Sequence, residues 1–426
     1  MPPEQPSTIH DNRAQADQLF RRAAELLMSD ETMPAMALLQ DCLAHNPDHY
    51  DATRLAAAVA TQNGFTAQSR TIMESFYDRV PYHTERALRL GNEPALLTIR
   101  GFSGTSVIPW VTNDGRATTR LRGGHFTAKF LSVNPSYPNH RFTIAAENIL
   151  RPNAVPDFKL MLNTIADPDV EGETLKTLGR YLADCPNTPV INAPDQVLQT
   201  TRDANDQRLR GTSGVHFPQT HRVVFDAADA SSIAAEITRL GLDDTPVILR
   251  QVGTHTARST ALIRTRADLT DYTAGGELTG DYYLIRYIEQ LWRGEYFRKL
   301  RLFFIDGALY PVVCHIDKTW NVHGGNRKDL MRGNPALMAE EKRFLLDWRS
   351  YVGAANADRL ERLAQDVGLD FFGIDFTTTD DGILIYEMNP AMRHSFDHAE
   401  DFSYKLPFDM AISQAFTAMI ETRLSA

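Results

Sequence analysis

The sequence has little cysteine, and the three cysteines that it has lie far apart. Cys42, Cys185 and Cys314 form no CxxC pair and show none of the Cys/His spacings that bind zinc. A few scattered thiols are typical of proteins from a reducing compartment. The sequence therefore predicts three unpaired thiols and argues against a disulfide framework or a structural zinc site.

Long hydrophobic runs and an excess of positive charge are also lacking. No stretch approaches the roughly 18 uncharged apolar residues that cross a membrane. The polar start, MPPEQPSTIHDNRAQ, has no apolar core of a secretion signal. The formal net charge of −10 argues against a general nucleic-acid binder, although it permits a local basic groove. We expect a cytoplasmic protein that binds neither membranes nor nucleic acid.

The motifs of two common nucleotide-binding folds are absent as well. Neither GxGxxG nor GxxxxGK[ST] occurs, which argues against the Rossmann and P-loop folds. No Ser/His/Asp or Cys/His pattern indicates a covalent nucleophile. What is present is a chain of 426 residues, 43% hydrophobic and 23% charged. That composition and length predict a soluble globular protein of two to four domains.

The first part of the chain has the periodicity of paired helices. Residues 1–12 look like a disordered lead-in, and from about Ala14 to Val80 apolar residues recur at helical spacing. After the first helix, further helices are expected at about 34–45, 51–62 and 67–79. The fragment LLQDCLAHNPDHYDA, with Asn-Pro after a helix, resembles a tetratricopeptide repeat.

About one and a half to two such repeats fit into residues 13–82, fewer than the usual three. We therefore expect these helices to pack on the domain that follows instead of standing alone. A plain helical bundle is the alternative interpretation. Contact of the helices with a peptide or protein partner is a further possibility that the sequence leaves open.

Between residues 83 and 195 the pattern changes to alternating strands and a helix. Strands are expected at 94–102, 107–112, 126–133, 158–165 and 188–192, and a helix at about 172–184. Asn113-Asp114-Gly115 is a hairpin turn signal. This order predicts a small α/β domain.

The strongest functional signal is FFGIDFTTTDDGILIYEMNPAMRH, residues 371–394. Two strand-like runs flank Asp381-Gly382, a hairpin signal that sets Asp375 opposite Glu387, roughly 5 Å apart. Strand alternation places Asn389 on the same face as Glu387. The same alternation turns four apolar neighbours to the other face: Ile374, Phe376, Leu384 and Tyr386.

Two carboxylates this close repel each other unless one is protonated or a cation lies between them. With an amide oxygen they form an all-oxygen set that suits Mg²⁺, whose remaining ligands are water and phosphate. The alternative is a surface hairpin whose acids are only solvated, but the apolar opposite face indicates burial.

This segment resembles the metal-binding end of the ATP-grasp ligases, in which G-[IV]-D, a hairpin and E-x-N-P follow one another. The resemblance implies that Asp375, Glu387 and Asn389 hold Mg²⁺, two ions in that family, which bridge the phosphates of ATP. It covers about residues 155–400. It implies a mixed α/β and α+β fold: an ATP-grasp fold with a central subdomain at 196–275 and a C-terminal subdomain at 276–426, preceded by the short all-α helical-repeat domain.

The segment TPVILRQVGTHTARST, residues 245–260, resembles the family's first nucleotide strand and phosphate-covering loop. Arg250 stands where the family usually has a lysine that contacts the α- and β-phosphates, and arginine keeps that charge with a different shape. The loop has one glycine, Gly253, where two or three are common. His255 either contacts a phosphate or substrate or is a simple loop histidine.

The segment DYYLIRYI, residues 281–288, resembles the hinge that pairs with the adenine edge. The resemblance implies that Tyr287 and Ile288 contact the base and that Glu289 takes the ribose hydroxyls. A sheet strand followed by an exposed acid would look the same.

The segment EYFRKLRLFFIDGALYPVV, residues 295–313, has a turn at Asp306-Gly307 and cations before an apolar run. In the family, an arginine that begins this strand stabilises the transferring phosphoryl group. Arg301 is the first candidate for that catalytic role and Arg298 the second. The alternative is that these cations cap a strand edge. The polar stretch from His315 to His323 could line an acceptor site.

The family resemblance implies a ligase that joins a small-molecule or peptide carboxylate to an amine, or less readily to a hydroxyl, through an acyl phosphate. Phosphoryl transfer of this kind needs positioning and charge neutralisation more than a covalent residue. A phosphotransferase on the same fold and a non-catalytic ATP-binding scaffold are the alternatives. The sequence leaves the oligomeric state open, a homodimer included.

Overall fold

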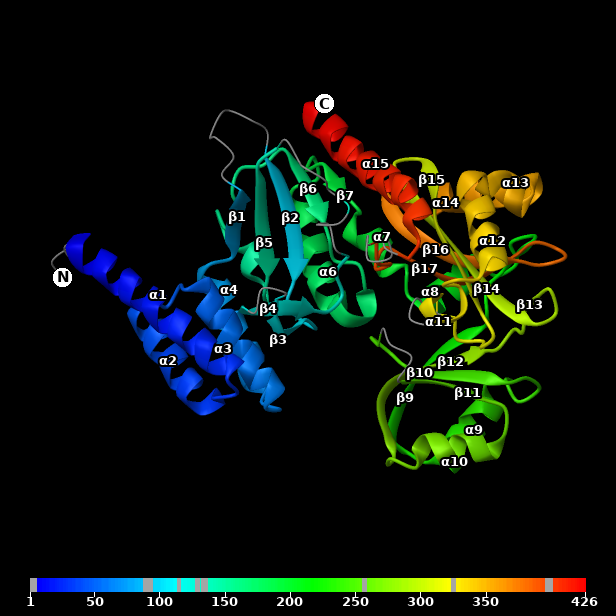
Figure 1. The fold of residues 1–426 in the computed structure, drawn as a ribbon, viewed down its shortest axis with the longest axis horizontal. Helices are drawn as coiled ribbons and strands as arrows, with labels where there is room; N and C mark the ends of the chain where they lie inside the picture. The colour runs from blue at the N-terminus through cyan, green and yellow to red at the C-terminus, as the bar shows by residue number, and fades with distance from the viewer. Residues whose placement is uncertain are drawn as a thin grey trace. The chain divides into compact units, whose positions relative to one another are not determined.

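The computed structural model describes residues 6–86, 95–112, 116–126, 131, 137–254, 259–322, 327–394 and 401–426. It divides into two compact units (Figure 1). The N-terminal unit comprises Met1–His125, Tyr137–Ile165 and Val170–Val190, and the C-terminal unit comprises Phe126–Ser136, Ala166–Asp169 and Ile191–Ala426. The finer division into five segments stays a prediction. None of the described helices is long and apolar enough to cross a membrane.

The N-terminal unit opens with four helices: α1 (Pro6–Met28), α2 (Thr32–His45), α3 (Tyr50–Gln62) and α4 (Thr66–Arg79). The three later helices lie within two residues of their predicted ends. The disordered lead-in was wrong for residues 6–12, because α1 begins at Pro6. Proline is well tolerated at the first helical position, where its missing N–H has no partner to lose.

The helices pack on the domain that follows, as predicted. Met73 and Phe76 of α4 share an apolar cluster with Phe102, Val107 and Ala145 of the next domain. The pairing of helices fits a helical-repeat region, and the tetratricopeptide assignment itself stays a prediction.

The remainder of the N-terminal unit is a small α/β domain. Its five-stranded sheet has the order β1-β5-β2-β6-β7, with β2 parallel to β5 and β6. The elements are β1 (Tyr82–Arg86), β2 (Leu96–Gly101), β3 (Ser106–Val111), β4 (Ala117–Arg122), β5 (Asn139–Ile144), η1 (Asn148–Leu150), β6 (Leu160–Asn163), α6 (Pro168–Asp184) and β7 (Val190–Ile191). The strand predicted at 126–133 is not found at Phe126, and most of its other residues lie outside the described part of the chain. The turn residues 113–115 lie outside it too, between the antiparallel strands β3 and β4.

The C-terminal unit contains two sheets that hold the candidate site between them. The first is four-stranded and antiparallel, in the order β11-β10-β12-β9. Its elements, with the two helices that precede it, are α7 (Pro194–Leu198), α8 (Arg202–Leu209), β9 (Thr220–Ala228), α9 (Ala230–Arg239), β10 (Val247–Gln251), β11 (Thr260–Ile263), α10 (Arg266–Thr273) and β12 (Leu278–Arg286). Because β12 lies in this sheet, the sheet extends past the predicted subdomain boundary at residue 275.

The second sheet is six-stranded, in the order β13-β14-β16-β17-β8, with β15 paired to β14. Its strands are β8 (Val215–His216), β13 (Leu291–Trp292), β14 (Tyr296–Ile305), β15 (Ala308–Asp317), β16 (Phe371–Thr378) and β17 (Ile383–Asn389). The turn between β14 and β15 needs positive φ at two successive residues, 47° at Asp306 and 93° at Gly307. Asp-Gly tolerates that conformation, which is why this sequence predicted the hairpin correctly.

Helices complete the C-terminal unit and support the six-stranded sheet. They are α11 (Arg327–Leu330), α12 (Pro335–Leu346), α13 (Trp348–Val352), α14 (Ala354–Asp366), η3 (Ser403–Lys405) and α15 (Leu406–Ser425). Phe371 of β16 packs on Phe303 and on Phe416 of α15 with ring centroids 5.4 and 5.2 Å apart. This aromatic core fixes the strands that carry the site.

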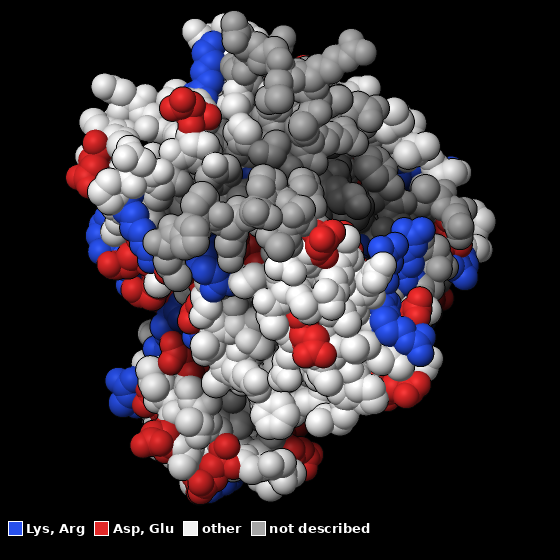
Figure 2. Space-filling view, turned by 90° about the vertical axis from the view of Figure 1, so that its left-hand side faces the viewer, with Lys and Arg blue, Asp and Glu red and all other residues white. Residues whose placement is uncertain are grey.

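Two other sequence predictions can be compared with the structure. None of the three cysteines forms a disulfide. Among the described residues on the face that Figure 2 shows, Lys and Arg side chains are interspersed with Asp and Glu.

Candidate active site

The β16–β17 hairpin brings two carboxylates together. Asp375 and Glu387 are direct cross-strand partners, and Asn389 donates from Nδ2 to Glu387 Oε1 at 2.9 Å. The predicted juxtaposition of these three side chains is therefore present. The register shifts after Asp375, so that Phe376 pairs with Ile385 and leaves Tyr386 as an extra residue.

Because of this extra residue, the predicted alternation of side chains between the two faces of β17 is wrong. Leu384 and Tyr386 were expected to face away from Glu387, but all three line the same cavity. An extra residue in one strand breaks the two-residue period and turns the following side chain to the other side. Ile374 and Phe376 on the partner strand are fully buried.

Asp375 is held by two cations from β14. Arg301 lies opposite it in the sheet register and contacts both carboxylate oxygens, Nε to Oδ1 at 2.6 Å and Nη2 to Oδ2 at 2.9 Å. Lys299 Nζ lies 3.1 Å from Oδ2. Burial by itself raises the pKa of Asp375, but Arg301 and Lys299 outweigh it and hold the pKa far below its usual value. The carboxylate is therefore ionised although only 1% of the side chain is exposed.

Glu387 faces two different cations. Arg202 of α8 places Nη2 3.0 Å from Glu387 Oε1 and donates from Nη1 to the Tyr386 carbonyl at 2.9 Å. Burial raises the pKa of Glu387, but the charges of Arg202 and Arg250 prevail and lower it to about 2. Both acids of the hairpin are thus anionic at neutral pH, each balanced by its own pair of cations.

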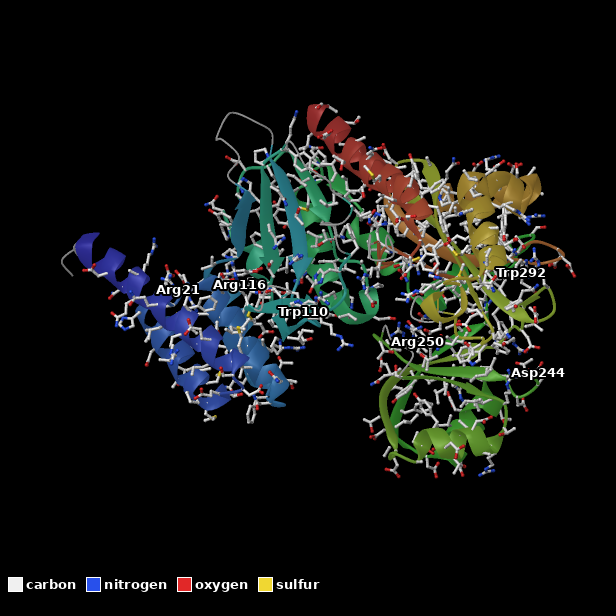
Figure 3. The ribbon with its side chains drawn as sticks, in the orientation of Figure 1. Arg21, Trp110, Arg116, Asp244, Arg250 and Trp292 are labelled. Atoms are coloured by element: carbon white, nitrogen blue, oxygen red, sulfur yellow. The ribbon has the colours of Figure 1, made fainter. Side chains whose placement is uncertain are left out.

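Arg250 is the cation that the four-stranded sheet contributes to the site. It extends from β10 (Figure 3). Its Nη2 donates to the carbonyl of Thr254 in the following loop. Burial and the neighbouring charge of Arg202 lower its pKa to about 10, so it remains a cation at neutral pH. Gly253 has a φ of 71°, a left-handed conformation that glycine adopts without strain. His255 lies outside the described residues.

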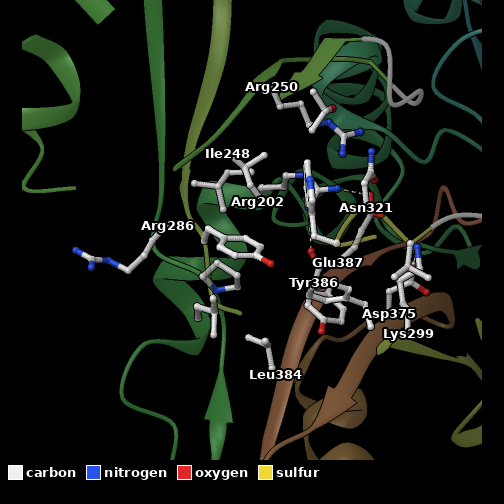
Figure 4. Close-up of a pocket in the computed structure, with 18 residues that line it drawn as sticks. Arg202, Ile248, Arg250, Arg286, Lys299, Asn321, Asp375, Leu384, Tyr386 and Glu387 are labelled. Carbon is white, nitrogen blue, oxygen red and sulfur yellow. Dashed lines mark hydrogen bonds and ion pairs between the residues drawn. The ribbon is translucent and has the colours of Figure 1, made fainter. Parts of the chain in front are cut away.

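The charged side chains described above line one end of a cavity whose other end is apolar. The cavity lies between the two sheets and has a volume of about 160 Å³. Its charged end is formed by Arg202, Arg250, Lys299, Asp375 and Glu387 (Figure 4). Its apolar lining is Pro218, Ile248, Ile285, Tyr287, Ile288, Phe297, Trp320, Val322, Leu384 and Tyr386. Arg286 extends away from this space in Figure 4, toward Asp244.

The three predicted hinge residues are placed differently from one another. Tyr287 and Ile288 line the apolar part of the cavity. The rings of Tyr287 and Trp320 are nearly perpendicular, with centroids 6.1 Å apart. The side chain of Glu289 is 54% exposed, lies 3.9 Å from Arg264 and does not line the cavity. The structure therefore brings the first two, but not Glu289, into the site.

A second recess adjoins the charged end. It is lined by Asp167, Asp169, Thr200, Thr201, Gly253, Thr254, Tyr283 and Asn389, among others, and it shares three residues with the first cavity. The shared residues are Arg202, Arg250 and Glu387. The first cavity thus combines an apolar lining with a charged end, and a small polar recess of about 30 Å³ adjoins that end.

The structure separates the two catalytic candidates on β14. Arg301 contacts Asp375, whereas Arg298 is 7% exposed and donates to the Tyr351 hydroxyl and to Thr378 Oγ1. Residues three apart on a strand point to opposite faces. Arg298 thus lies on the face that packs against α13, outside the cluster of cations.

Four cations surround the hairpin carboxylates, and the sequence predicted no role for two of them, Lys299 and Arg202. Lys299 could have been found, because it lies two positions from Arg301 and therefore shares its face. Arg202 comes from a helix that begins 185 residues before Glu387, and no local pattern links the two.

The donor set fits Mg²⁺ in its chemistry. It consists of two ionised carboxylates and an amide, all presented by one pair of strands, and oxygen is the ligand atom that Mg²⁺ prefers. No group of three His, Cys, Asp or Glu residues with metal-binding geometry occurs within the described ranges, so water and phosphate oxygens would have to complete the shell. The Asn389 amide oxygen accepts a hydrogen bond from the Ala391 N–H at 2.9 Å. It would keep that hydrogen bond while also coordinating an ion.

Acid should destabilise the C-terminal unit through Glu387. Its pKa falls from an ordinary 4.5 to about 2 on folding. Its contribution to stability is complete above about pH 4.5 and is lost as the pH drops toward 2. Between pH 5 and pH 2 we expect the free energy of unfolding of wild type to fall by roughly 2 to 3 kcal/mol more than that of Glu387→Gln. Urea unfolding, followed by tryptophan fluorescence, measures this, since three of the four tryptophans lie in this unit. Equal pH profiles for the two proteins would contradict it.

Comparison with known proteins finds similarity at the level of structure. No protein-family model matches the sequence, and no curated protein does. A RimK-domain ATP-grasp protein from Sphaerobacter thermophilus is 16% identical with a TM-score of 0.42, over 76% of this chain and 98% of that one. D-alanyl-alanine synthetase A from Vibrio cholerae is 10% identical with a TM-score of 0.43, and the match covers 79% of this chain and 100% of that one. PsnB, solved with a precursor variant, Mg and ADP, is 11% identical with a TM-score of 0.39, over 78% and 99%.

These similar structures are ATP-grasp ligases. The mixed fold class with helices first, predicted from the sequence, agrees with the described elements. At these identities and TM-scores the likeness to ATP-grasp ligases assigns neither a reaction nor a substrate to this chain.

Proposed function

We propose that this protein is an ATP- and magnesium-dependent ligase that joins a carboxylate to an amine through an acyl phosphate. One observation carries the proposal: a cavity that is apolar at one end and, at the other, is lined by two ionised carboxylates and the three cations Arg202, Arg250 and Lys299. A nucleoside triphosphate has the same polarity, with a flat base at one end and a chain of phosphates at the other.

The chemistry follows from the charges. Transfer of the γ-phosphoryl group to a substrate carboxylate spreads negative charge over the oxygens, and catalysis consists largely of positioning and neutralising that charge. Arg250, Lys299, Arg301 and Arg202 supply positive charge around this position. Mg²⁺ bound by Asp375, Glu387 and Asn389 would supply further neutralisation and hold the phosphate oxygens. An amine then displaces phosphate from the acyl phosphate and forms the amide.

Four of the predicted nucleotide contacts have a place in this proposal. Tyr287 and Ile288 flank the base, and Arg250 and Gly253 lie where the phosphate tail would pass. Ribose recognition by Glu289 has little geometric support, because that side chain is exposed and outside the cavity. The small polar recess beside Asn389 adjoins the phosphate end, and the carboxylate group of the acid would lie at its mouth.

Release of ADP and phosphate, measured with panels of carboxylic acids and amines, tests the proposal. We expect both products to depend on an acid and on Mg²⁺, and a condensed product to form when an amine is present. Hydroxylamine in place of the amine should trap the acyl phosphate as a hydroxamate. A stable phosphorylated product without condensation would indicate a phosphotransferase instead. ATP binding without turnover under every combination would indicate a non-catalytic scaffold.

Arg250 should contribute through its charge more than through its shape. Arg250→Ala is expected to raise the KM for ATP by about 10- to 100-fold, because it removes a partly buried cation from the phosphate end. Arg250→Lys should stay within a few-fold of wild type, since lysine is also a phosphate ligand. Arg239→Ala on the exposed side of α9 serves as the control. Equal KM values for Arg250→Ala and wild type would remove Arg250 from the nucleotide site.

A further inference from the structure

The short helix α8 contacts both sheets of the C-terminal unit. Arg202 and Asn205 contact β17 of the six-stranded sheet, whereas Asp203 and Asp206 contact β9 of the four-stranded sheet. Residues three apart lie on the same side of a helix, and the two pairs are offset by one residue, about 100° around the helix axis. One side of the helix therefore binds each sheet.

On the first side, Asn205 holds the backbone of the hairpin that carries the candidate metal ligands. Asn205 is 1% exposed, and its Nδ2 donates to the Met388 carbonyl at 2.8 Å and to the Thr200 carbonyl at 3.1 Å. Met388 lies between Glu387 and Asn389 in the sequence. The hydrogen bond to Met388 therefore fixes the main chain between those two side chains.

Side chains of α8 bind β17 beyond the point where β8 pairs with it. Within the described residues, β8 pairs with β17 as far as Leu384. Farther along β17, the carbonyls of Tyr386 and Met388 accept hydrogen bonds from Arg202 and Asn205. Loss of such a partner would leave a carbonyl unsatisfied, which is costly where the chain is buried. These two hydrogen bonds thus constrain the part of β17 that reaches the cavity.

On the other side, two acids of α8 anchor β9. Asp206 is 4% exposed, and its Oδ2 accepts from the N–H of Thr220, the first residue of β9, at 3.0 Å. Asp203 Oδ2 accepts from Arg222 Nε at 3.3 Å. The start of β9 is therefore fixed to the same helix as the hairpin.

The anchored strand is linked in register to Arg250. Arg222 of β9 pairs with Tyr283 of β12, and Tyr283 pairs with Arg250 of β10. Directly opposite residues on neighbouring strands lie on the same face of a sheet. The position of Arg250 relative to Glu387 therefore depends on α8, which contacts β9 on one side and β17 on the other.

We propose that Asn205 and Asp206 are positioning residues that hold the hairpin with the candidate metal ligands and the sheet with Arg250 at the separation that the reaction needs. The inference rests on the proposed function. Neither residue is among the described residues that line the two cavities, so each acts through the groups that it holds. Residues that support metal ligands in this way typically contribute about 10- to 100-fold to metal affinity or activity. Asn205 should therefore act on Mg²⁺ binding, and Asp206 on nucleotide binding.

Steady-state kinetics of Asn205→Ala and of the matched control Asn192→Ala test the role of Asn205. Asn192 is also fully buried, and its Nδ2 donates to the carbonyl of Phe371, the first residue of β16, at 2.8 Å. Its φ of 60° strains an alanine, so Asn192→Ala should lower the melting temperature at least as much as Asn205→Ala. We expect Asn205→Ala to lower kcat and to raise the Mg²⁺ concentration for half-maximal turnover, each by about 10-fold or more. Asn192→Ala should keep both within a few-fold of wild type.

Calorimetric titration with ADP gives a readout that needs no turnover. Saturating Mg²⁺ should tighten ADP binding to wild type and to Asn192→Ala by about 10-fold, and much less to Asn205→Ala. Without Mg²⁺ the three proteins should bind ADP alike. Asp206→Ala should weaken ADP binding about 10-fold with or without Mg²⁺, because it releases the sheet that carries Arg250. Asp206→Asn keeps an oxygen for the Thr220 N–H and should restore binding to within a few-fold of wild type.

Two kinds of result would overturn the inference, and they differ in what they leave standing. Equal Mg²⁺ dependence of Asn205→Ala and Asn192→Ala, or equal ADP affinity of Asp206→Ala and wild type, would show that the two residues only support the fold. The proposed function would then remain. Wild type that neither binds ADP nor releases it would remove the proposed function and this inference together. Asn205→Ser, whose shorter side chain ends before the Met388 carbonyl, replaces Asn205→Ala if the alanine variant does not fold.

Discussion

Glu387→Gln should lower the rate of ADP release by at least about 100-fold while the protein remains folded. The substitution preserves the size of the side chain and an oxygen that can accept from Arg202 and Asn389. It removes the negative charge that balances Arg202 and Arg250 and that would hold Mg²⁺. The effect should therefore fall on turnover more than on folding. A coupled assay for ADP and a circular dichroism melting curve measure the two separately.

Asp380→Asn is the matched control for this experiment. Asp380 lies at the exposed turn of the same hairpin and carries the same charge, but it contacts none of the site residues in the described structure. It should retain nearly full activity. Normal turnover in Glu387→Gln, or equal losses in both variants, would show that the hairpin carboxylates are surface groups without a role in the reaction.

Arg301→Lys should reduce turnover about 100-fold, whereas Arg298→Lys should leave it within a few-fold of wild type. Arg301 makes a two-pronged contact with Asp375 that lysine cannot reproduce, although lysine keeps the charge that Asp375 needs for stability. Arg298 points to the other face of β14, toward Tyr351 and Thr378. Its substitution should lower the melting temperature without changing the reaction.

Steady-state rates and melting temperatures of both variants decide between these roles. Loss of turnover in Arg298→Lys with normal turnover in Arg301→Lys would reverse the assignment. We expect the melting temperature of Arg301→Lys to stay within a few degrees of that of wild type, because Lys299 still contacts Asp375.

Local sequence patterns predicted the strands of the site well. Asp381-Gly382 and Asp306-Gly307 mark the two turns of the central hairpins, and the positive φ values at Asp306 and Gly307 explain why such pairs are reliable. Once the turn at residue 382 is fixed, the pairing of residues 376–378 follows from counting along the strands, and continued counting would set Asp375 opposite Tyr386. The extra residue at Tyr386, which no turn signal reveals, sets Asp375 opposite Glu387 instead.

Local sequence signals therefore specify the helices at the start of the chain and the hairpins of the site. Each depends on residues a few positions apart, where turn geometry and side-chain period act directly. The cations that balance Asp375 and Glu387 come together only when the chain folds, because Arg202, Arg250 and Arg301 come from three different elements. Charge interactions depend on distance in space, and sequence separation carries no record of it.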